Sequence, residues 1–280
     1  MKNIIKVFAF SLIIAIVLFS CSKENESTPP DYSNIETLPK DSGGIQKAVF
    51  YNSSINIYGY YVYIPSGYEQ SKAIYPLLIF LHGSGEAGNS MKDSSVLKKV
   101  ANNGPPKLIK YKKWSPRYPM IVVSPQCQDS WWDPNKVHKF IGSLIKNYRI
   151  NPKRIYLTGL SMGGYGSYSY IETYADSGYA AAVVSICGAG NPSKASKYMK
   201  TPLWAFHGDA DKTVPTINSI NIVSAINILN PEIKAKLTIY PGVGHDSWSM
   251  TYDGSGMGKE SKSYDAFNMS IYDWMFQYSK

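Results

Sequence analysis

Residues 155–164, Ile-Tyr-Leu-Thr-Gly-Leu-Ser-Met-Gly-Gly, constrain the fold of this chain more than any other stretch. An apolar run leads into the G-x-S-x-G pattern centred on Ser161, and a helix-like segment follows. This pattern is typical of a serine held on a sharp turn between a strand and a helix, with its hydroxyl exposed. Glycine is needed on both sides of the serine because side chains there would crowd so tight a turn.

Apolar runs alternate with helical patterns along the rest of the chain. The run at residues 75–81 is unbroken, as in strands buried on both faces. Further strands are expected at 119–123, 154–158, 179–186, 202–206 and 236–240. Apolar residues recur with helical spacing over 135–148, and further helices are expected after Ser161, at 216–229 and at about 264–278. The alternation predicts an α/β fold, a mostly parallel sheet of about eight strands with helices on both faces.

Three regions depart from this alternation. Residues 47–51 and 57–64 are rich in β-branched and aromatic residues and predict an antiparallel pair at one edge of the sheet. Segment 91–113 is expected to be partly helical, with a break at Gly104-Pro105-Pro106. No long insertion separates the strands, so we expect no large lid over the sheet.

Motifs rich in glycine and polar residues follow five of the predicted strands, at residues 82–86, 124–132, 159–163, 207–211 and 242–245. In a parallel sheet these motifs meet at one edge, and ligands bind beyond the carboxyl ends of the strands. The candidate chemistry of the chain is therefore expected at this edge.

A serine hydroxyl needs a base to remove its proton, and the chain has four histidines. His82 directly precedes the loop where an oxyanion site is expected, and His138 lies off the apolar face of a predicted helix and is expected to be exposed. His207 directly follows a strand, so we expect it to pack or hydrogen-bond locally. His245, on a glycine-rich loop after the last strand, is our candidate for the general base.

An imidazole base is in turn oriented by a carboxylate. Asp209 and Asp211 lie in the loop after strand 202–206, and Asp246 adjoins His245, although neighbouring side chains usually point apart. We choose Asp211. Asp209 is the competing candidate, and its alternative role is to build the turn of this loop. Donors for a developing oxyanion are expected from the backbone N–H of Met162 and from Gly83 or Ser84.

The order Ser161, Asp211, His245 resembles that of the α/β-hydrolase superfamily. Within it, the segments YPLLIFLHGSGEAG, RIYLTGLSMGGYGS and HGDADKTVP are similar to those of feruloyl-esterase-like and polyhydroxybutyrate-depolymerase-like esterases, whose relatives include prolyl-oligopeptidase-like "predicted peptidases". The resemblance covers about residues 50–278. It implies a serine esterase without a cofactor that acts on carboxylic esters, with acetyl or feruloyl groups on polysaccharide as the expected substrates.

Trp131, Trp132 and Trp248 lie on the loops at the carboxyl edge and are candidates for stacking on a sugar or an aromatic acyl group, with core packing as the alternative. Two other functions stay open: a serine peptidase, and a glycan-binding lipoprotein without catalysis. No H-E-x-x-H motif, zinc-spaced cysteine pair or phosphate-binding loop occurs, so we predict no metal.

The first twenty residues begin with lysines and continue as an apolar core too short for a membrane-spanning helix. Leu18-Phe19-Ser20-Cys21 resembles a bacterial lipoprotein signal, which implies lipidation of Cys21, for example with palmitate. We thus expect a signal peptide at 1–20, a flexible tether at 21–44 and a catalytic domain at 45–280. The protein would be exported and anchored to the bacterial outer membrane; an ordinary secretory signal that includes Cys21 is the alternative.

The formal net charge of the chain is +9, but its lysines show no helical stripe. Nucleic-acid binding needs a clustered basic face, so we expect no nucleic-acid partner and a solvated basic surface near anionic lipid or polysaccharide. Cys127 and Cys187 follow strands about three spacings apart and are predicted to be free thiols.

Overall fold

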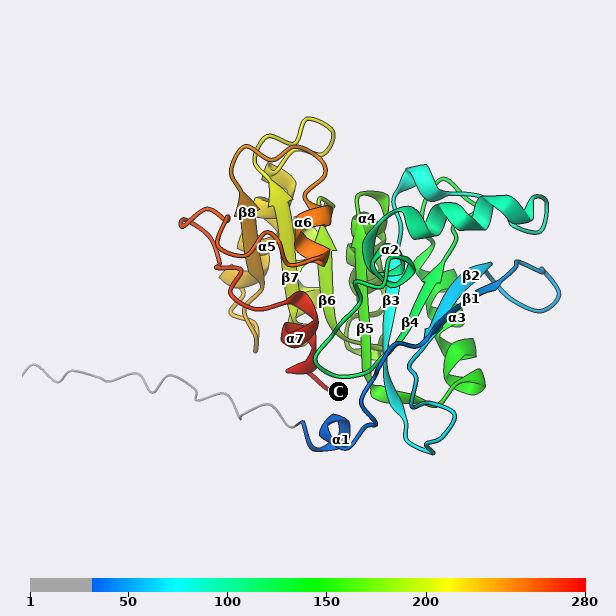
Figure 1. Cartoon of the computed structure of the whole chain (residues 1–280). Helices are drawn as coiled ribbons and strands as arrows, with labels where there is room; N and C mark the ends of the chain where they lie inside the picture. Colours follow the sequence, from blue (N-terminus) through cyan, green and yellow to red (C-terminus); the bar gives the residue numbers. More distant parts are fainter. Residues whose placement is uncertain (1–31) are drawn as a thin grey trace, which may run out of the picture. The chain divides into compact units, whose positions relative to one another are not determined.

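The structure is a computed structural model that describes residues 32–280 (Figure 1). These residues form an eight-stranded sheet of order β1-β2-β4-β3-β5-β6-β7-β8. The strands are β1 (Ile45–Val49), β2 (Tyr60–Ile64), β3 (Tyr75–Leu81), β4 (Ile121–Pro125), β5 (Ile150–Leu160), β6 (Ala180–Ile186), β7 (Leu203–Gly208) and β8 (Lys236–Tyr240). β1 and β2 pair antiparallel at one edge, and β4 to β8 are parallel to β3. The predicted α/β sheet is confirmed.

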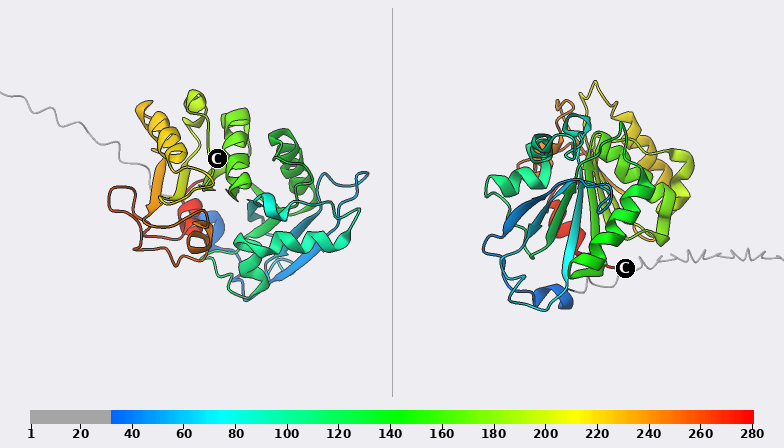
Figure 2. Two further views of the ribbon diagram at one scale, coloured as in Figure 1. Left: turned by 90° about the horizontal axis from the view of Figure 1, so that it is seen from above. Right: turned by 90° about the vertical axis from the view of Figure 1, so that its right-hand side faces the viewer.

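Helices cover both faces of this sheet, as the alternating pattern predicts (Figure 2). The helices are α1 (Ser33–Glu36), α2 (Gly104–Lys110), α3 (Pro134–Asn147), α4 (Met162–Tyr174), α5 (Ile217–Ile228), α6 (Trp248–Tyr252) and α7 (Ile271–Phe276). Shorter 3-10 turns are η1 (Ser84–Glu86), η2 (Ser94–Asn102), η3 (Ala175–Ser177) and η4 (Pro192–Tyr198). Seen from above, α3, α4 and α5 lie on one face, and α2, α6 and α7 lie on the other.

The core lies where the middle strands are covered twice. Every residue of β3, β4 and β6 is buried, because helices remove both faces of these strands from water. Burial of this much apolar side-chain surface is the main driving force for the fold and holds the carboxyl ends of the strands in fixed positions. The loops at that edge are therefore built on a rigid base.

Two helix predictions need correction, and one helix was missed. Gly104-Pro105-Pro106 begins α2 instead of breaking a helix, since proline is tolerated in a first turn where its missing N–H has no intrahelical partner. The helix predicted at 264–278 shrinks to α7, because Ser261 and Asp265 donate backbone N–H groups to the outer edge of β8. The short helix α6 was not predicted.

The residues before β1 also differ from the expectation of a flexible tether. Ile35 and Leu38 are buried in the core cluster, and the Asp41 carboxylate accepts hydrogen bonds from the Tyr63 hydroxyl at 2.6 Å and the Ser66 N–H at 3.1 Å. Residues 32–44 are thus packed onto the domain. The predicted signal peptide, Cys21 and the first part of the tether lie outside the described residues.

Two further findings concern thiols and membrane spans. Cys127 and Cys187 are both free and buried, as predicted. Within residues 32–280, no helix combines the length and the apolar character that crossing a bilayer requires.

Candidate active site

Ser161 sits on a strained turn between β5 and α4. Its backbone has φ +51° and ψ −119°, and its N–H donates to the Ile186 carbonyl at 2.9 Å. A Cβ at Gly159 would overlap the Gly163 carbonyl, and one at Gly163 would overlap that of Leu81. Only glycine fits at both positions, and the turn presents the serine side chain at the carboxyl edge of the sheet.

The three side chains chosen from the sequence form one chain of hydrogen bonds. The Ser161 Oγ lies 2.9 Å from Nε2 of His245, and Nδ1 of the same imidazole lies 2.7 Å from Oδ2 of Asp211. They come from the turn after β5, the loop after β8 and the loop after β7. Because a carboxylate can only accept, Nδ1 carries the proton and Nε2 is free to accept the serine proton.

The Asp211 carboxylate is buried and well supplied with donors. Its Oδ1 accepts backbone N–H groups from Thr213 at 2.8 Å and Val214 at 2.9 Å. Burial alone would raise the pKa of Asp211, but the hydrogen bonds from His245 and these two amides outweigh it and lower that pKa. The carboxylate is therefore ionised at neutral pH.

The other carboxylate candidates have local roles. Asp209 accepts the Gly242 N–H at 2.6 Å, which ties the loop after β7 to the loop after β8. Asp246 accepts from the backbone and hydroxyl of Ser249 at the start of α6. Neither makes a hydrogen bond to His245 within residues 32–280.

His207 lies behind Asp211 and is fully buried. Its Nε2 lies 2.9 Å from the Val214 carbonyl and 3.2 Å from Asp211 Oδ2, and its Nδ1 lies 2.7 Å from the Ser219 hydroxyl. A carbonyl only accepts, so Nε2 is the protonated nitrogen, and burial lowers the pKa of His207 so that it stays neutral. The local role expected for this histidine thus includes direct contact with the carboxylate that faces His245.

His82 fixes the loop after β3 in a similar way. Its Nε2 accepts the Cys127 N–H at 2.9 Å, so Nδ1 carries the proton and donates to the Gly83 carbonyl at 2.6 Å. Burial lowers the pKa of His82 to about 4. A Cβ at Gly83 would lie 3.7 Å from that of Ser161, so this loop adjoins the serine.

The two expected oxyanion donors remain available at this place. The Met162 N–H is the first of helix α4, and the Ser84 N–H belongs to the peptide whose carbonyl His82 holds. Neither has an acceptor among the described residues. Amides at the start of a helix favour a nearby negative charge.

Glu86 and Asn103 support the wall of the site, and sequence reasoning missed both. The Asn103 amide donates to Glu86 Oε1 at 2.6 Å, and its oxygen accepts the Trp248 indole N–H at 3.1 Å. The Trp248 ring meets the His245 ring edge to face at 5.3 Å. The signal available for Glu86 was its position in His-Gly-Ser-Gly-Glu, directly after the predicted oxyanion loop.

The structure gives different results for the three tryptophans that were predicted to bind substrate. Trp132 is buried, and its indole N–H donates to the His82 carbonyl at 3.0 Å, so the prediction that it binds substrate is wrong. Trp131 is 61% exposed and meets Tyr165 edge to face at 5.6 Å, and Trp248 lines the site beside His245. Tyr165, on the first turn of α4, was not predicted.

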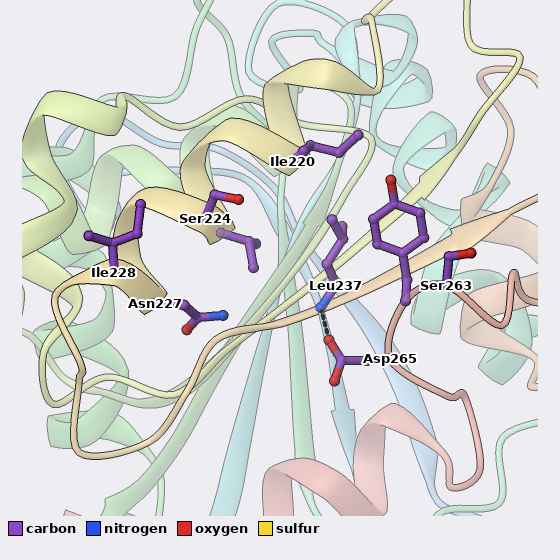
Figure 3. Close-up of a pocket in the computed structure, with 9 residues that line it drawn as sticks. Ile220, Ser224, Asn227, Ile228, Leu237, Ser263 and Asp265 are labelled. Carbon is purple, nitrogen blue, oxygen red and sulfur yellow. Dashed lines mark hydrogen bonds between the residues drawn. The ribbon is translucent and has the colours of Figure 1, made fainter.

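A surface cavity of about 570 Å³ lies elsewhere, between α5, β8 and residues 263–265. Figure 3 shows Ile220 and Ile228 of α5 on one side of it, and Leu237 of β8 donating its N–H to Asp265 on the other. Its Asn227 and Asp265 side chains are bonded to the backbone of Ala235 and Leu237, and no histidine among the described residues lines it, so it lacks the base that acyl transfer requires.

Cys187, Asp211 and His245 bring potential metal-ligand atoms within 4.8 Å of one another. The carboxylate and the imidazole are engaged with each other, however, and burial raises the pKa of the Cys187 thiol, which keeps it protonated and a poor ligand. This arrangement suits proton transfer better than metal binding.

A family model described as phospholipase/carboxylesterase matches residues 67–253. The chain belongs to this family. A thermostable esterase is 26% identical with a TM-score of 0.62, and the match covers 85% of the present chain but 63% of that protein. The phospholipase/carboxylesterase match and this neighbour support a carboxylic ester hydrolase with the α/β-hydrolase fold.

Two other solved structures share the fold. One is the feruloyl esterase module from Clostridium thermocellum, as an S954A mutant complexed with sinapinate, which is 16% identical with a TM-score of 0.56 and coverage of 90% and 93%. The other is a truncated carbohydrate esterase from gut microbiota, at 17% identity, a TM-score of 0.50 and coverage of 89% and 97%. A search of curated proteins finds none with a matching sequence.

Proposed function

We propose that this chain cleaves carboxylic esters through an acyl-enzyme, with Ser161 as nucleophile, His245 as general base and Asp211 as its orienting carboxylate. The observation that carries the proposal is the continuous hydrogen-bond chain, at 2.9 Å from serine to imidazole and 2.7 Å from imidazole to carboxylate. Side chains at these distances need no rearrangement for proton transfer.

In the first half of the reaction the Ser161 Oγ bonds to the ester carbonyl carbon while its proton passes to Nε2 of His245. The carbonyl oxygen becomes an oxyanion, which the N–H groups of Met162 and of Ser84 or Gly83 stabilise. Each such donor lowers the activation barrier by roughly 3 kcal/mol. The imidazolium then protonates the leaving alkoxide, the C–O bond breaks, and the acyl group stays on Ser161.

In the second half a water molecule takes the place of the alcohol. His245 removes its proton, the hydroxide adds to the acyl carbon, and the acyl–serine bond breaks as the imidazolium returns a proton to Oγ. The Asp211 carboxylate remains ionised and stabilises the imidazolium twice in each cycle.

The substrate we propose is an acetyl or feruloyl ester on a polysaccharide. Exposed Trp131 beside Tyr165 offers an open aromatic surface, and Trp248 packs beside His245. The feruloyl and carbohydrate esterases that share the fold make these esters the first to test. We also propose export and a lipid anchor at Cys21, which lies outside the described residues.

The test uses p-nitrophenyl acetate and methyl ferulate with the parent protein and Ser161→Ala. We expect turnover in the parent and a loss of at least about 10³-fold in kcat for the variant, since the nucleophile is removed. Ser169→Ala, on the same helix, is the matched control and should keep full activity. Equal rates in parent and Ser161→Ala would exclude Ser161, and turnover of peptides without esters would favour a peptidase.

A further inference from the structure

Positive charge is concentrated in one short segment of the chain. Between Lys92 and Arg117 the sequence holds eight lysine or arginine residues and one acid, Asp93, a net charge of +7 in a chain whose net charge is +9. Most of the net charge therefore comes from this one segment, which we call the basic segment, although its lysines show no helical stripe.

The charges of the basic segment are not neutralised. Within residues 32–280 none of its cations forms an ion pair, whereas lysines elsewhere do, as Lys136 does with Asp129 at 2.7 Å. Apart from half-buried Lys107, its cations are exposed. Like charges held together without counter-charges repel one another, so the surface favours an anionic partner.

The basic segment lies next to the candidate active site. It occupies the connection between β3 and β4, which also holds η1, η2 and α2, and Figure 1 labels α2 in front of the sheet. Asn103, at the start of α2, accepts the hydrogen bond from Trp248, whose ring packs against His245. Helix α2 thus starts at the wall of the site and leads away from it.

Two adjoining cavities lie beside this wall, since Gly104 and Ser249, the residues after Asn103 and Trp248, line the first of them. One, of about 180 Å³, lies between α2 and α6; the other, of about 450 Å³, extends to Arg117. Both are lined by Leu108, Lys113, Tyr252 and Asp253, so they form one groove, which Lys107 also lines. Tyr111 at its edge is 58% exposed and offers a face for a sugar ring. Of the two carboxylates in the groove, Asp273 is bonded to Ser270 and Asp253 to the Ser255 N–H.

We propose that this groove binds an acidic polysaccharide, whose uronate carboxylates pair with Lys107, Lys113 and Arg117 while the ester-bearing sugar reaches Ser161. The proposal rests on the proposed esterase function and specifies its substrate class. A bilayer surface would meet the outermost cations, but it cannot enter a groove that starts at the catalytic wall. Polar and aromatic groups beside the cations suit hydroxylated sugar rings.

The experiment compares the parent with Lys107→Gln/Lys113→Gln/Arg117→Gln, and with Lys72→Gln/Lys197→Gln/Lys234→Gln as a control of equal charge loss. The readout is the ratio of kcat/KM on acetylated polygalacturonate to that on p-nitrophenyl acetate, with acetylated glucomannan as the neutral polymer. Three contacts, each as strong as an exposed ion pair, together change the affinity for the polymer roughly tenfold. The groove variant should therefore lose about tenfold in this ratio at low salt, where charges are least screened. The control variant and the glucomannan ratio should stay unchanged.

Binding is measured separately, so that it does not depend on catalysis. Ser161→Ala should retain binding to unesterified polygalacturonate in affinity electrophoresis, and the groove substitutions in that background should abolish it. If polygalacturonate binds but no ester is cleaved, the groove stands and the esterase proposal fails. If esters are cleaved but polygalacturonate does not bind, or if only anionic phosphatidylglycerol vesicles bind, the groove proposal is overturned.

Discussion

The same two residues occur at the ends of β3 and β7: His82-Gly83 directly follows β3, and His207-Gly208 closes β7. Each histidine is fully buried and neutral. The His82 imidazole contacts backbone groups, the Gly83 carbonyl and the Cys127 N–H. The His207 imidazole also lies 3.2 Å from the Asp211 carboxylate. Both hold a loop in place, but only the second also acts on a charge within the proposed triad.

This difference teaches that a buried histidine at a strand end can have two separable effects. One is geometric, since each imidazole supplies one donor and one acceptor to backbone or hydroxyl groups that would otherwise be unsatisfied. The other is electrostatic, since the Nε2–H of His207 adds to the donors around Asp211. Substitutions that keep the ring volume can separate the two.

The largest effect is expected within the loop after β7. Asp211→Asn should lower kcat on p-nitrophenyl acetate by about 10³- to 10⁴-fold, because the amide cannot stabilise the imidazolium or hold the required tautomer. Asp209→Asn, which affects the link to Gly242, is the matched control and should stay within a few-fold of the parent. A large loss in Asp209→Asn with a small one in Asp211→Asn would reverse the assignment.

The next effect compares the histidines directly. His82→Phe and His207→Phe each remove two hydrogen-bonding nitrogens, and both should lower kcat by about 10- to 100-fold through misplaced loops, a loss of about 1.4–2.7 kcal/mol in transition-state stabilisation. Only His207→Phe should also move the acidic limb of the kcat/KM profile to higher pH, because Asp211 then loses a donor and attracts the imidazolium more strongly. The measurement is a pH–rate profile between pH 5 and 9. Equal displacement of the limb in both variants would remove the distinction.

A smaller effect concerns acid stability. A histidine of pKa 6.5 in the unfolded chain and about 4 in the fold leaves the unfolded state with more bound protons between these values, so stability falls as the pH drops through that window. For His82 the loss between pH 7 and pH 5 is about 2 kcal/mol. His207, whose pKa is also lowered, acts in the same direction.

Urea unfolding at pH 7 and pH 5 measures this loss. His82→Phe should be less stable than the parent at pH 7, since the Gly83 carbonyl and the Cys127 N–H lose their partner, but it should lose about 2 kcal/mol less on acidification. Lys72→Gln, at an exposed site, should have the same free energy of unfolding as the parent at both pH 7 and pH 5. An unchanged pH dependence in His82→Phe would show that His82 takes up protons in the fold.

Much of this architecture follows from local patterns in the sequence. β3 and β8 match their predicted bounds because the sequence changes character at their ends, to His82-Gly83 after β3 and to Pro241-Gly242 after β8. The chain order of Ser161, Asp211 and His245 placed each residue at a strand end, and a parallel sheet brings such ends together. Their catalytic roles stay predictions.

What the sequence could not give depends on contacts between distant segments. Tyr165 of α4 meets Trp131 in the loop after β4, and Asn103 before α2 accepts from Trp248 of α6, contacts that no local pattern records. The helix predicted at 264–278 was too long because the free edge of β8 offers backbone partners to residues 261–265. The cations of the basic segment follow no helical period, and only the fold places Lys107, Lys113 and Arg117 along one groove.

The smallest effect is expected in the loop after β4, which packs on His82. Trp132 supports that histidine, since its indole N–H donates to the His82 carbonyl, whereas Trp131 is exposed beside Tyr165. Trp131→Ala should raise KM for methyl ferulate two- to fivefold, because one exposed aromatic contact contributes about 0.5–1 kcal/mol, and should leave KM for p-nitrophenyl acetate unchanged. Trp132→Ala should instead cost about 3 kcal/mol of unfolding free energy. The pair is measured by steady-state kinetics and urea unfolding, and a KM effect confined to Trp132→Ala would mean that the exposed ring has no part in acyl recognition.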